Sequence, residues 1–422
     1  MDRILLRSLE HPLPAGMRDL LPEEAAGRRA LSAAVLGRFA LFGYRLVTPP
    51  AFELAHVVER GLGTSAASDV LRFIEPESGE VAVLRPDMTP QIARIVATRM
   101  RDHAPPYRIA YEGTVVRRRT GRAKKHRQIP QVGVELCGVS AETADLELLE
   151  LASDALRAAG LVRFTIDLAD AGIVRELLEG VPPERAADIT EALSRKDEAS
   201  LAEHVRGLAN AAALLALPQL HGGREALEEA VQVLGGTRAN AAARRLLALF
   251  DAASKQGLAP YLTADAGEVR GFAYYTGTIF SIYAEGPGEP IGAGGRYDEL
   301  LARFGAPMAA VGFGLDLDAL AWALRTAGAA ALPRTGVVYV GDNTDGRVAA
   351  LRRRGIPAVA VAYHDAALAH ARSWGHAVVW NGPSVFDVAA ETSTRIDADA
   401  AGDADREAAL VARVLETLPR GA

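Results

Sequence analysis

Polar side chains alternate along one predicted strand, residues 128–138 (QIPQVGVELCG). Because successive side chains of a strand point to opposite faces, Gln131, Gly133 and Glu135 share one face, and the apolar residues that alternate with them share the other. The apolar face is core, and the polar face presents an amide and a carboxylate over a glycine. The alternative is a half-exposed antiparallel sheet whose polar residues only face water.

A second group of polar side chains lies in LRPDMTPQ, residues 84–91. Asp87 can receive an ammonium group, with the Thr89 hydroxyl beside it. Alternatively, Thr89 only caps the helix that Pro90 begins, and Asp87 interacts favourably with the N-terminal dipole of that helix.

A third group lies in VRGFAYYTG, residues 269–277. Arg270 precedes a glycine, so it can approach a carboxylate closely, and Tyr274 or Tyr275 can face a ring. Two consecutive tyrosines in a strand are more often core residues, and this alternative stays open.

Two further segments have weaker signals. The basic run from Arg117 to Arg127, in which Arg117 and Arg119 share a strand face, can hold phosphate or RNA, but such short runs on a hairpin are usually solvated. GAGGRYD (292–298) does not lead from a strand into a helix, so it is not a dinucleotide-binding fingerprint. Its glycines more plausibly let backbone approach a small ligand. Neither a Ser-His-Asp order, nor H-E-x-x-H, nor a P-loop is present.

The elements that position these groups follow from hydrophobic periodicity and from Gly and Pro punctuation. We expect a helix from Pro22 to Gly43 and another from Thr89. Short apolar runs predict strands, and the expected strand segments are 44–53 (interrupted by Pro49 and Pro50), 81–87, 107–119, 128–138, 162–168 and 268–284, with a further run to 315.

The residue composition and periodicity of the sequence change twice along its length. Residues 172–258 are almost wholly Ala, Leu, Glu and Arg with helical spacing and carry no reactive group. The tail alternates short apolar strands with helices, which predicts a small parallel sheet. We therefore expect a core domain in two parts, a helical insertion and a small α/β domain, with bounds 1–171, 172–258, 259–330 and 335–422.

Composition limits the function classes. The chain has 422 residues, a net charge of −6 at pH 7 and one cysteine, Cys137. The negative charge argues against a dedicated nucleic-acid binder, and one cysteine allows neither an internal disulfide nor a Cys-based zinc site. Signal-peptide and membrane-span patterns are missing. We expect a cytoplasmic protein with no cofactor and no metal.

In order and spacing these segments resemble the class II histidyl-tRNA synthetase family. This family includes active synthetases and a catalytically inactive relative, the regulatory subunit of ATP phosphoribosyltransferase, which acts in the first step of histidine biosynthesis. The resemblance covers residues 10–325 and implies an α+β fold with a mostly antiparallel class II sheet, a helical insertion and a small C-terminal α/β segment. Its motifs are PAGMRDLLPEE, GYRLVTPPAFE, LRPDMTPQIAR, VRGFAYYTGTIF, GGRYDEL and GFGLDLDAL.

The resemblance also implies a histidine pocket. The α-ammonium group is implied to lie among Asp87, Thr89 and Gln131, and the carboxylate near Arg270. Glu135 and the second tyrosine of the pair would address the imidazole. Asp87 stands where the synthetases usually have glutamate, which is one methylene longer. The residues assigned to this pocket are Asp87, Thr89, Arg117, Gln131, Glu135, Arg270, Tyr274 and Tyr275.

Three positions depart from the synthetase pattern on its nucleotide side. Arg119 replaces a glutamate that organises ATP, Ala319 replaces an arginine, and Asp316 replaces a glycine. Stabilising phosphoryl charge requires cations there, so adenylation is not expected.

The departures favour the inactive relative. The resemblance to that relative implies a non-catalytic subunit that forms a homodimeric core, binds a short-form catalytic ATP phosphoribosyltransferase, and makes it active and sensitive to feedback by L-histidine. Membrane or nucleic-acid partners are not expected. The alternatives are an active histidyl-tRNA synthetase and a synthetase-like module that senses tRNA.

Overall fold

The chain forms two compact units. The first comprises Met1–Asp19 and Arg28–Ala327, and the second comprises Leu20–Gly27 and Gly328–Ala422. A computed structural model describes residues 13–62, 70–117, 126–269, 274–329, 335–342, 344–396 and 402–418.

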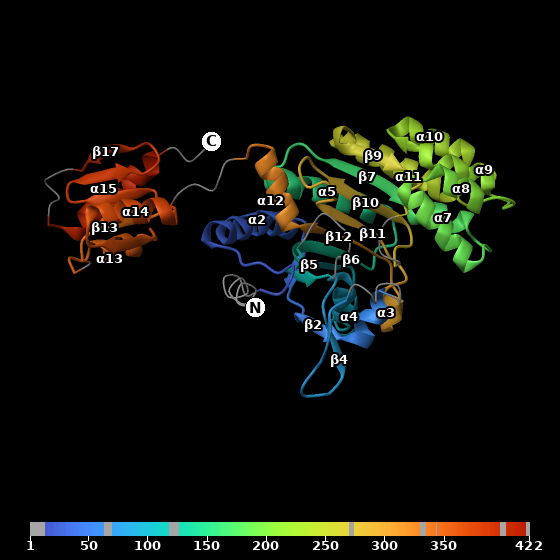
Figure 1. Cartoon of the computed structure of the whole chain (residues 1–422), viewed down its shortest axis with the longest axis horizontal. Coiled ribbons are helices and arrows are strands. Elements are labelled where there is room, and N and C mark those ends of the chain that lie inside the picture. The colour runs from blue at the N-terminus through green and yellow to red at the C-terminus, as the bar shows by residue number, and fades with distance from the viewer. Residues whose placement is uncertain are drawn as a thin grey trace, which may run out of the picture. The chain divides into compact units, whose positions relative to one another are not determined.

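A nine-stranded sheet runs through the first unit (Figure 1), in the order β1-β5-β6-β12-β11-β10-β7-β9-β8. Only the pairs β1–β5 and β7–β9 are parallel. The other neighbours are antiparallel, which confirms the predicted sheet type. The strands are β1 Arg45–Val47, β5 Tyr107–Val116, β6 Gln128–Cys137, β7 Thr165–Asp170, β8 His221–Gly222, β9 Leu262–Asp265, β10 Thr278–Tyr283, β11 Gly292–Arg296 and β12 Ala310–Asp316.

Apolar residues cover both faces of this sheet near its centre. On one face, the side chains of Val132, Val134 and Leu136 are fully buried in a core shared with helices α2 (Pro22–Leu41) and α5 (Thr143–Ala158). On the other face lies a second core, which includes residues of α4 (Thr89–Arg99). The predicted alternation along β6 is confirmed. The alternative, a half-exposed sheet whose polar residues only face water, is wrong because the second face of β6 is also covered.

Local signals set several element boundaries. Pro49 and Pro50 separate β1 from β2 (Phe52–Leu54), which belongs to a different sheet. That sheet has the order β2-β4-β3, with β4 at Val81–Leu84 and β3 at Arg72–Ile74. Proline occupies the first turn of α4 as expected, but Met88 is the N-cap residue and no side chain caps this helix. The predicted capping role of Thr89 is therefore wrong.

Helices dominate the predicted insertion. Figure 1 shows them gathered beside β7 and β9. The short strand β8 lies among them, which the sequence did not predict. The helices are α6 Ala171–Leu177, α7 Pro183–Arg195, α8 Glu198–His204, α9 Ala211–Ala216, α10 Arg224–Val233 and α11 Asn240–Ala253.

The second unit has its own five-stranded sheet, in the order β14-β13-β15-β16-β17. The first three strands pair parallel, as predicted, and β16 and β17 add an antiparallel edge. The sequence did not predict β17 because all four of its residues are exposed and polar. The elements are β13 Val337–Val340, α13 Arg347–Arg353, β14 Ala358–Val361, α14 His364–Trp374, β15 Val378–Asn381, β16 Ser384–Asp387, β17 Thr392–Arg395 and α15 Ala404–Thr417.

Among the described residues, every helix is too short or too polar to cross a lipid bilayer.

Candidate functional site

A buried carboxylate is the centre of the predicted site. Glu135 on β6 is 1% exposed, although sequence alternation placed it on a polar face. The hydroxyl of Thr89, at the start of α4, donates to its Oε1 at 2.7 Å, and the hydroxyl of Tyr297 donates to its Oε2. The buried carboxyl group therefore has hydrogen-bond partners on both oxygens, as burial of a polar group requires.

A second buried carboxylate lies beside the first. Asp87 is 6% exposed and accepts a hydrogen bond of 2.8 Å from the Tyr274 hydroxyl. The rings of Tyr274 and Tyr297 meet edge to face with centroids 5.6 Å apart. The contact between the Tyr274 and Tyr297 rings therefore connects the two carboxylates. We call Asp87, Thr89, Tyr111, Glu135, Tyr274 and Tyr297 the Glu135 cluster.

Two glycines make room for this cluster. Gly312 on β12 pairs with Glu135, and a Cβ atom there would lie 1.6 Å from Glu135 Oε2. Gly133 pairs with Tyr111 on β5, and a Cβ atom there would lie 2.4 Å from the Tyr111 hydroxyl. Side chains at either position would overlap with the cluster. The glycine floor predicted beside Glu135 therefore accommodates Tyr111.

The glycines of GAGGRYD have a different role from the one predicted. A Cβ atom at Gly294 would lie 2.4 Å from the carbonyl oxygen of Gly312 on the neighbouring strand. One at Gly292 would lie 2.5 Å from the Leu315 side chain. At these positions the close neighbours are protein atoms of the sheet.

Burial dominates the electrostatics of the cluster. Removal from water raises the pKa of Glu135 to about 8, and hydrogen bonds from Tyr297 and Thr89 oppose this shift only in part. Burial also raises the pKa of Tyr274 and of Tyr297. The cluster consequently holds a proton at neutral pH that a solvated glutamate would lose.

Gln131 lies four residues before Glu135 on the same strand face. Its Oε1 atom is buried and has no hydrogen-bond partner among the described residues. Buried polar atoms without partners are uncommon in native proteins. An acceptor of this kind suits the ammonium group of a ligand.

The two arginines near the cluster bind backbone carbonyls. Arg117 follows β5 and donates to the Pro86 carbonyl at 2.6 Å. Arg85 is 8% exposed and donates to the carbonyls of Pro49 and Thr114. Arg85 therefore holds the segment that carries Asp87 in place.

The remaining predicted positions have mixed outcomes. The ring of Tyr275 lies 4.9 Å from that of Tyr274, and burial raises the pKa of Tyr275. Neither residue lies in a strand, contrary to prediction, because β10 begins only at Thr278. Arg270 and Arg119 lie outside the described residues.

The predicted nucleotide side is organised around the start of α12 (Leu317–Thr326). Asp316 is the N-cap residue, and its carboxylate accepts hydrogen bonds of 3.0 Å from the backbone N–H groups of Asp318 and Ala319. Ala319 is 2% exposed and packs in the main core. A helix cap and a core contact thus account for two of the three departures.

Two cations on this side were missed by sequence reasoning. Arg18 and Arg28 donate to the two oxygens of the Asp318 carboxylate at 2.8 and 2.9 Å. The backbone N–H of Arg18 also donates to the side chain of Gln128 at 3.1 Å. Both guanidinium groups thus have an anionic partner within the protein.

One acidic group lies far from the cluster. Oxygen atoms of Asp167, Asp265 and Glu268 lie within 4.8 Å of one another. Lys196 is 2.8 Å from Asp265, and the Thr263 hydroxyl donates to Asp167. The lysine balances part of this charge, and we assign no metal to the group.

Tyr111 and Tyr297 are cluster residues that sequence reasoning did not identify. The alternation of side chains along β5 is the sequence pattern that could have identified Tyr111. The cross-strand pair of Tyr111 with Gly133 depends on register, which sequence alone does not provide. Tyr297 stands in the GGRYD motif, which was interpreted only for its glycines.

The fold and site define a class II synthetase-like protein of the histidyl-tRNA synthetase type. The family described as histidyl-tRNA synthetase matches residues 16–320. A solved structure from Bacillus halodurans C, described as an ATP phosphoribosyltransferase regulatory subunit/histidyl-tRNA synthetase, superimposes with a TM-score of 0.75 at 30% identity, covering 87% of this chain and 97% of that one.

The names of similar curated proteins show more narrowly to which family the chain belongs. The ATP phosphoribosyltransferase regulatory subunit of Anaeromyxobacter sp. (strain Fw109-5) is 43% identical over 325 residues, which are 76% of this chain and 94% of the relative. That of Geobacter sulfurreducens is 37% identical over 359 residues, 82% of each chain. The chain belongs to the family of ATP phosphoribosyltransferase regulatory subunits, which are built on the histidyl-tRNA synthetase fold.

Proposed function

We propose that this chain is the non-catalytic, histidine-sensing subunit of a cytoplasmic ATP phosphoribosyltransferase. Its partner is a short-form catalytic subunit, and its own core is a homodimer. The observation that carries the proposal is a contrast between two places in the first unit. The Glu135 cluster keeps the groups that suit an amino acid, whereas position 319 is a buried alanine behind the Asp316 cap.

The proposed effector is L-histidine, bound at the Glu135 cluster. Its ammonium group would lie among Asp87, Thr89 and Gln131, where the buried Gln131 Oε1 needs a donor. Its imidazole would donate to Glu135 and face Tyr275. Arg270 is assigned to the carboxylate from the sequence, and Arg117 and Tyr274 support the pocket walls.

Asp87 is one methylene shorter than the usual glutamate, and the geometry suggests how the difference is bridged. The Tyr274 hydroxyl reaches Asp87 at 2.8 Å. This contact holds the shorter carboxylate at the edge of the pocket, from which it would share the ammonium group with Thr89.

The proposed regulation of the catalytic subunit follows from thermodynamic linkage between histidine binding and the state of the assembly. If histidine binds one state of the assembly better than another, it shifts the population towards that state and changes the activity of the partner. No phosphoryl chemistry on this chain is needed. An active synthetase and a tRNA-sensing module are disfavoured by the names of the curated relatives.

Light scattering tests the proposed partnership. The purified chain and a short-form catalytic subunit, mixed at micromolar concentration, should give a species larger than either alone. Two species that stay separate under these conditions would contradict the partnership.

A further inference from the structure

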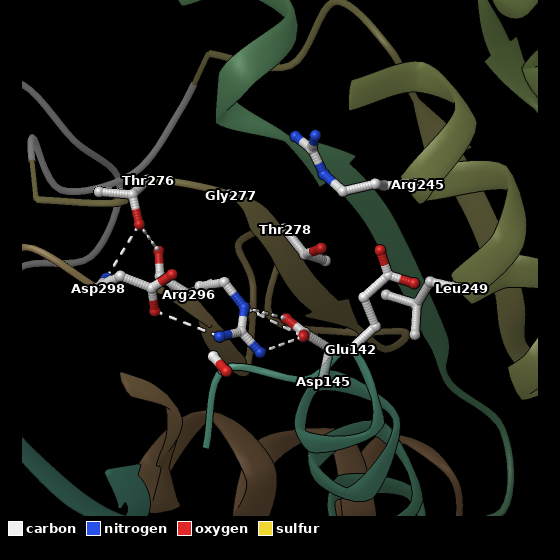
Figure 2. Close-up of a pocket in the computed structure, with 10 residues that line it drawn as sticks. Glu142, Asp145, Arg245, Leu249, Thr276, Gly277, Thr278, Arg296 and Asp298 are labelled. Atoms are coloured by element: carbon white, nitrogen blue, oxygen red, sulfur yellow. Dashed lines mark hydrogen bonds and ion pairs between the residues drawn. The ribbon is translucent and has the colours of Figure 1, made fainter. Parts of the chain in front are cut away.

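An open pocket lies on the opposite face of the sheet from the Glu135 cluster (Figure 2). Its volume is about 230 Å³, and it is bordered by the ends of β10 and β11, the start of α5 and helix α11. Arg296 bonds to Asp145 on α5, whereas the next residue, Tyr297, bonds to Glu135. Because α5 packs in the core on one face of the sheet and Tyr297 packs in the core on the other, the pocket and the cluster are separate sites.

Buried hydrogen bonds hold the floor of this pocket in place. Arg296 is 9% exposed; its Nε donates to Asp145 at 3.1 Å and its Nη1 donates to Asp298 at 3.2 Å. The Thr276 hydroxyl accepts from the backbone N–H of Asp298 at 3.0 Å. Since these groups already satisfy one another, the pocket shape exists without a ligand.

Two side chains of opposite charge, Glu142 and Arg245, lie at the rim of the pocket and make few interactions with the rest of the described chain. The Glu142 carboxylate, just before α5, has no hydrogen bond or ion pair among the described residues. Arg245 on α11 is 45% exposed and makes one ion pair of 3.3 Å, with Asp170. The Thr278 hydroxyl likewise has no hydrogen-bond partner in the described part of the chain. Figure 2 shows that these three side chains come from different elements around one space.

Size and charge define the class of ligand. A volume of about 230 Å³ is below the roughly 300–1,000 Å³ of pockets for drug-sized molecules, so the ligand is a small metabolite. A guanidinium prefers a carboxylate, and a carboxylate prefers an ammonium group. The acidic groups Glu142, Asp145 and Asp298 repel phosphate. Leu249 provides an apolar wall for a short side chain.

We infer that this pocket is a second binding site, which takes a small α-amino acid. Arg245 binds the carboxylate of the ligand, Glu142 binds its ammonium group, and the Thr278 hydroxyl accepts or donates beside them. The inference is independent of the proposed histidine site, because it uses none of the residues of the Glu135 cluster.

Calorimetric titration of the full chain with each common amino acid tests this inference. The titrations use a Glu135→Gln background, so that binding at the cluster is weakened. At least one small amino acid should bind. Adding Arg245→Gln or Glu142→Gln should weaken that binding about tenfold to a hundredfold, because each removes one charge-assisted hydrogen bond.

Arg244→Gln is the matched control, since Arg244 is the neighbouring arginine on α11 and, among the described residues, its side chain bonds to Asn240 one turn away. It should leave binding unchanged. The methyl ester of the bound amino acid should bind weakly to the parent and no more weakly to the Arg245→Gln variant. Absence of binding by every amino acid at millimolar concentration would overturn the inference, as would binding that survives both Arg245→Gln and Glu142→Gln. Glu142 is exposed, so its variant keeps the test valid if Arg245→Gln fails to fold.

Discussion

The carboxylate of Asp316 accepts a hydrogen bond of 3.0 Å from the backbone N–H of Ala319. These are two of the positions at which the chain departs from the synthetase pattern. Their contact caps the start of helix α12. A change at Asp316 is therefore expected to affect the stability of this helix start.

Asp316→Ala should lower the free energy of unfolding by about 1 kcal/mol, because it removes the side-chain cap of α12. Urea denaturation measures the change. Asp102→Ala, at an exposed turn, is the control and should change stability by less than about 0.5 kcal/mol. Equal stability of the two variants would show that the cap contributes little.

Histidine-dependent exchange of pyrophosphate into ATP should stay at the level of a reaction without enzyme. An arginine is missing at position 319, and the Arg18 and Arg28 guanidinium groups already bind Asp318. An active histidyl-tRNA synthetase serves as the positive control. Exchange well above background would restore the synthetase alternative.

Glu135→Gln should weaken histidine feedback on the reconstituted complex while leaving activation of the catalytic subunit intact. Donation by the imidazole N–H of bound histidine favours the ionised form of Glu135. The variant therefore removes a charged acceptor from the complex, which costs roughly 1.5–3 kcal/mol, or about ten- to a hundredfold in the inhibition constant. Inhibition curves for wild type and variant measure it. Glu112→Gln, at an exposed position of β5, is the matched control. Superimposable curves for wild type and Glu135→Gln would place histidine elsewhere.

Glu135 should also make stability depend on pH. Its pKa is about 8 in the folded chain and near 4.3 when unfolded, so the folded state binds more protons between these values. The contribution of Glu135 to the free energy of unfolding is fully present below about pH 4.3, falls as pH rises towards 8, and levels off above that.

The slope from this one group is at most about 1.4 kcal/mol per pH unit. Glutamine resembles the protonated carboxyl group, so Glu135→Gln should flatten the profile measured by denaturation between pH 5 and 8 by up to that slope. A wild-type profile that is no steeper than that of the variant would refute the proposed burial of a proton.

Sequence periodicity predicted which residues share a strand face, but not what covers that face. Alternation placed Gln131 and Glu135 together, and β6 bears this out. That the face is buried depends on α4, whose Thr89 lies 46 residues away in sequence from Glu135. The contact between Asp87 and Tyr274 spans 187 residues. Such contacts depend on strand order and register, which local propensities do not determine.

The helical insertion shows the same limit. Its periodicity predicted helices and no reactive group, and the helices are present. Arg245 nevertheless reaches the pocket beside Thr278, because α11 packs against the sheet. A charged residue on an amphipathic helix has the same local pattern whether it faces water or a pocket.

The transferase activity of the catalytic subunit tests the central proposal most directly. Turnover of ATP and phosphoribosyl pyrophosphate is measured for the short-form subunit alone, for this chain alone and for the mixture, each with and without L-histidine. The account predicts no turnover by this chain, a marked rise in the mixture, and inhibition of the mixture by histidine. A mixture no more active than the catalytic subunit alone would contradict the regulatory role, and an activated mixture that ignores histidine would contradict the sensing site.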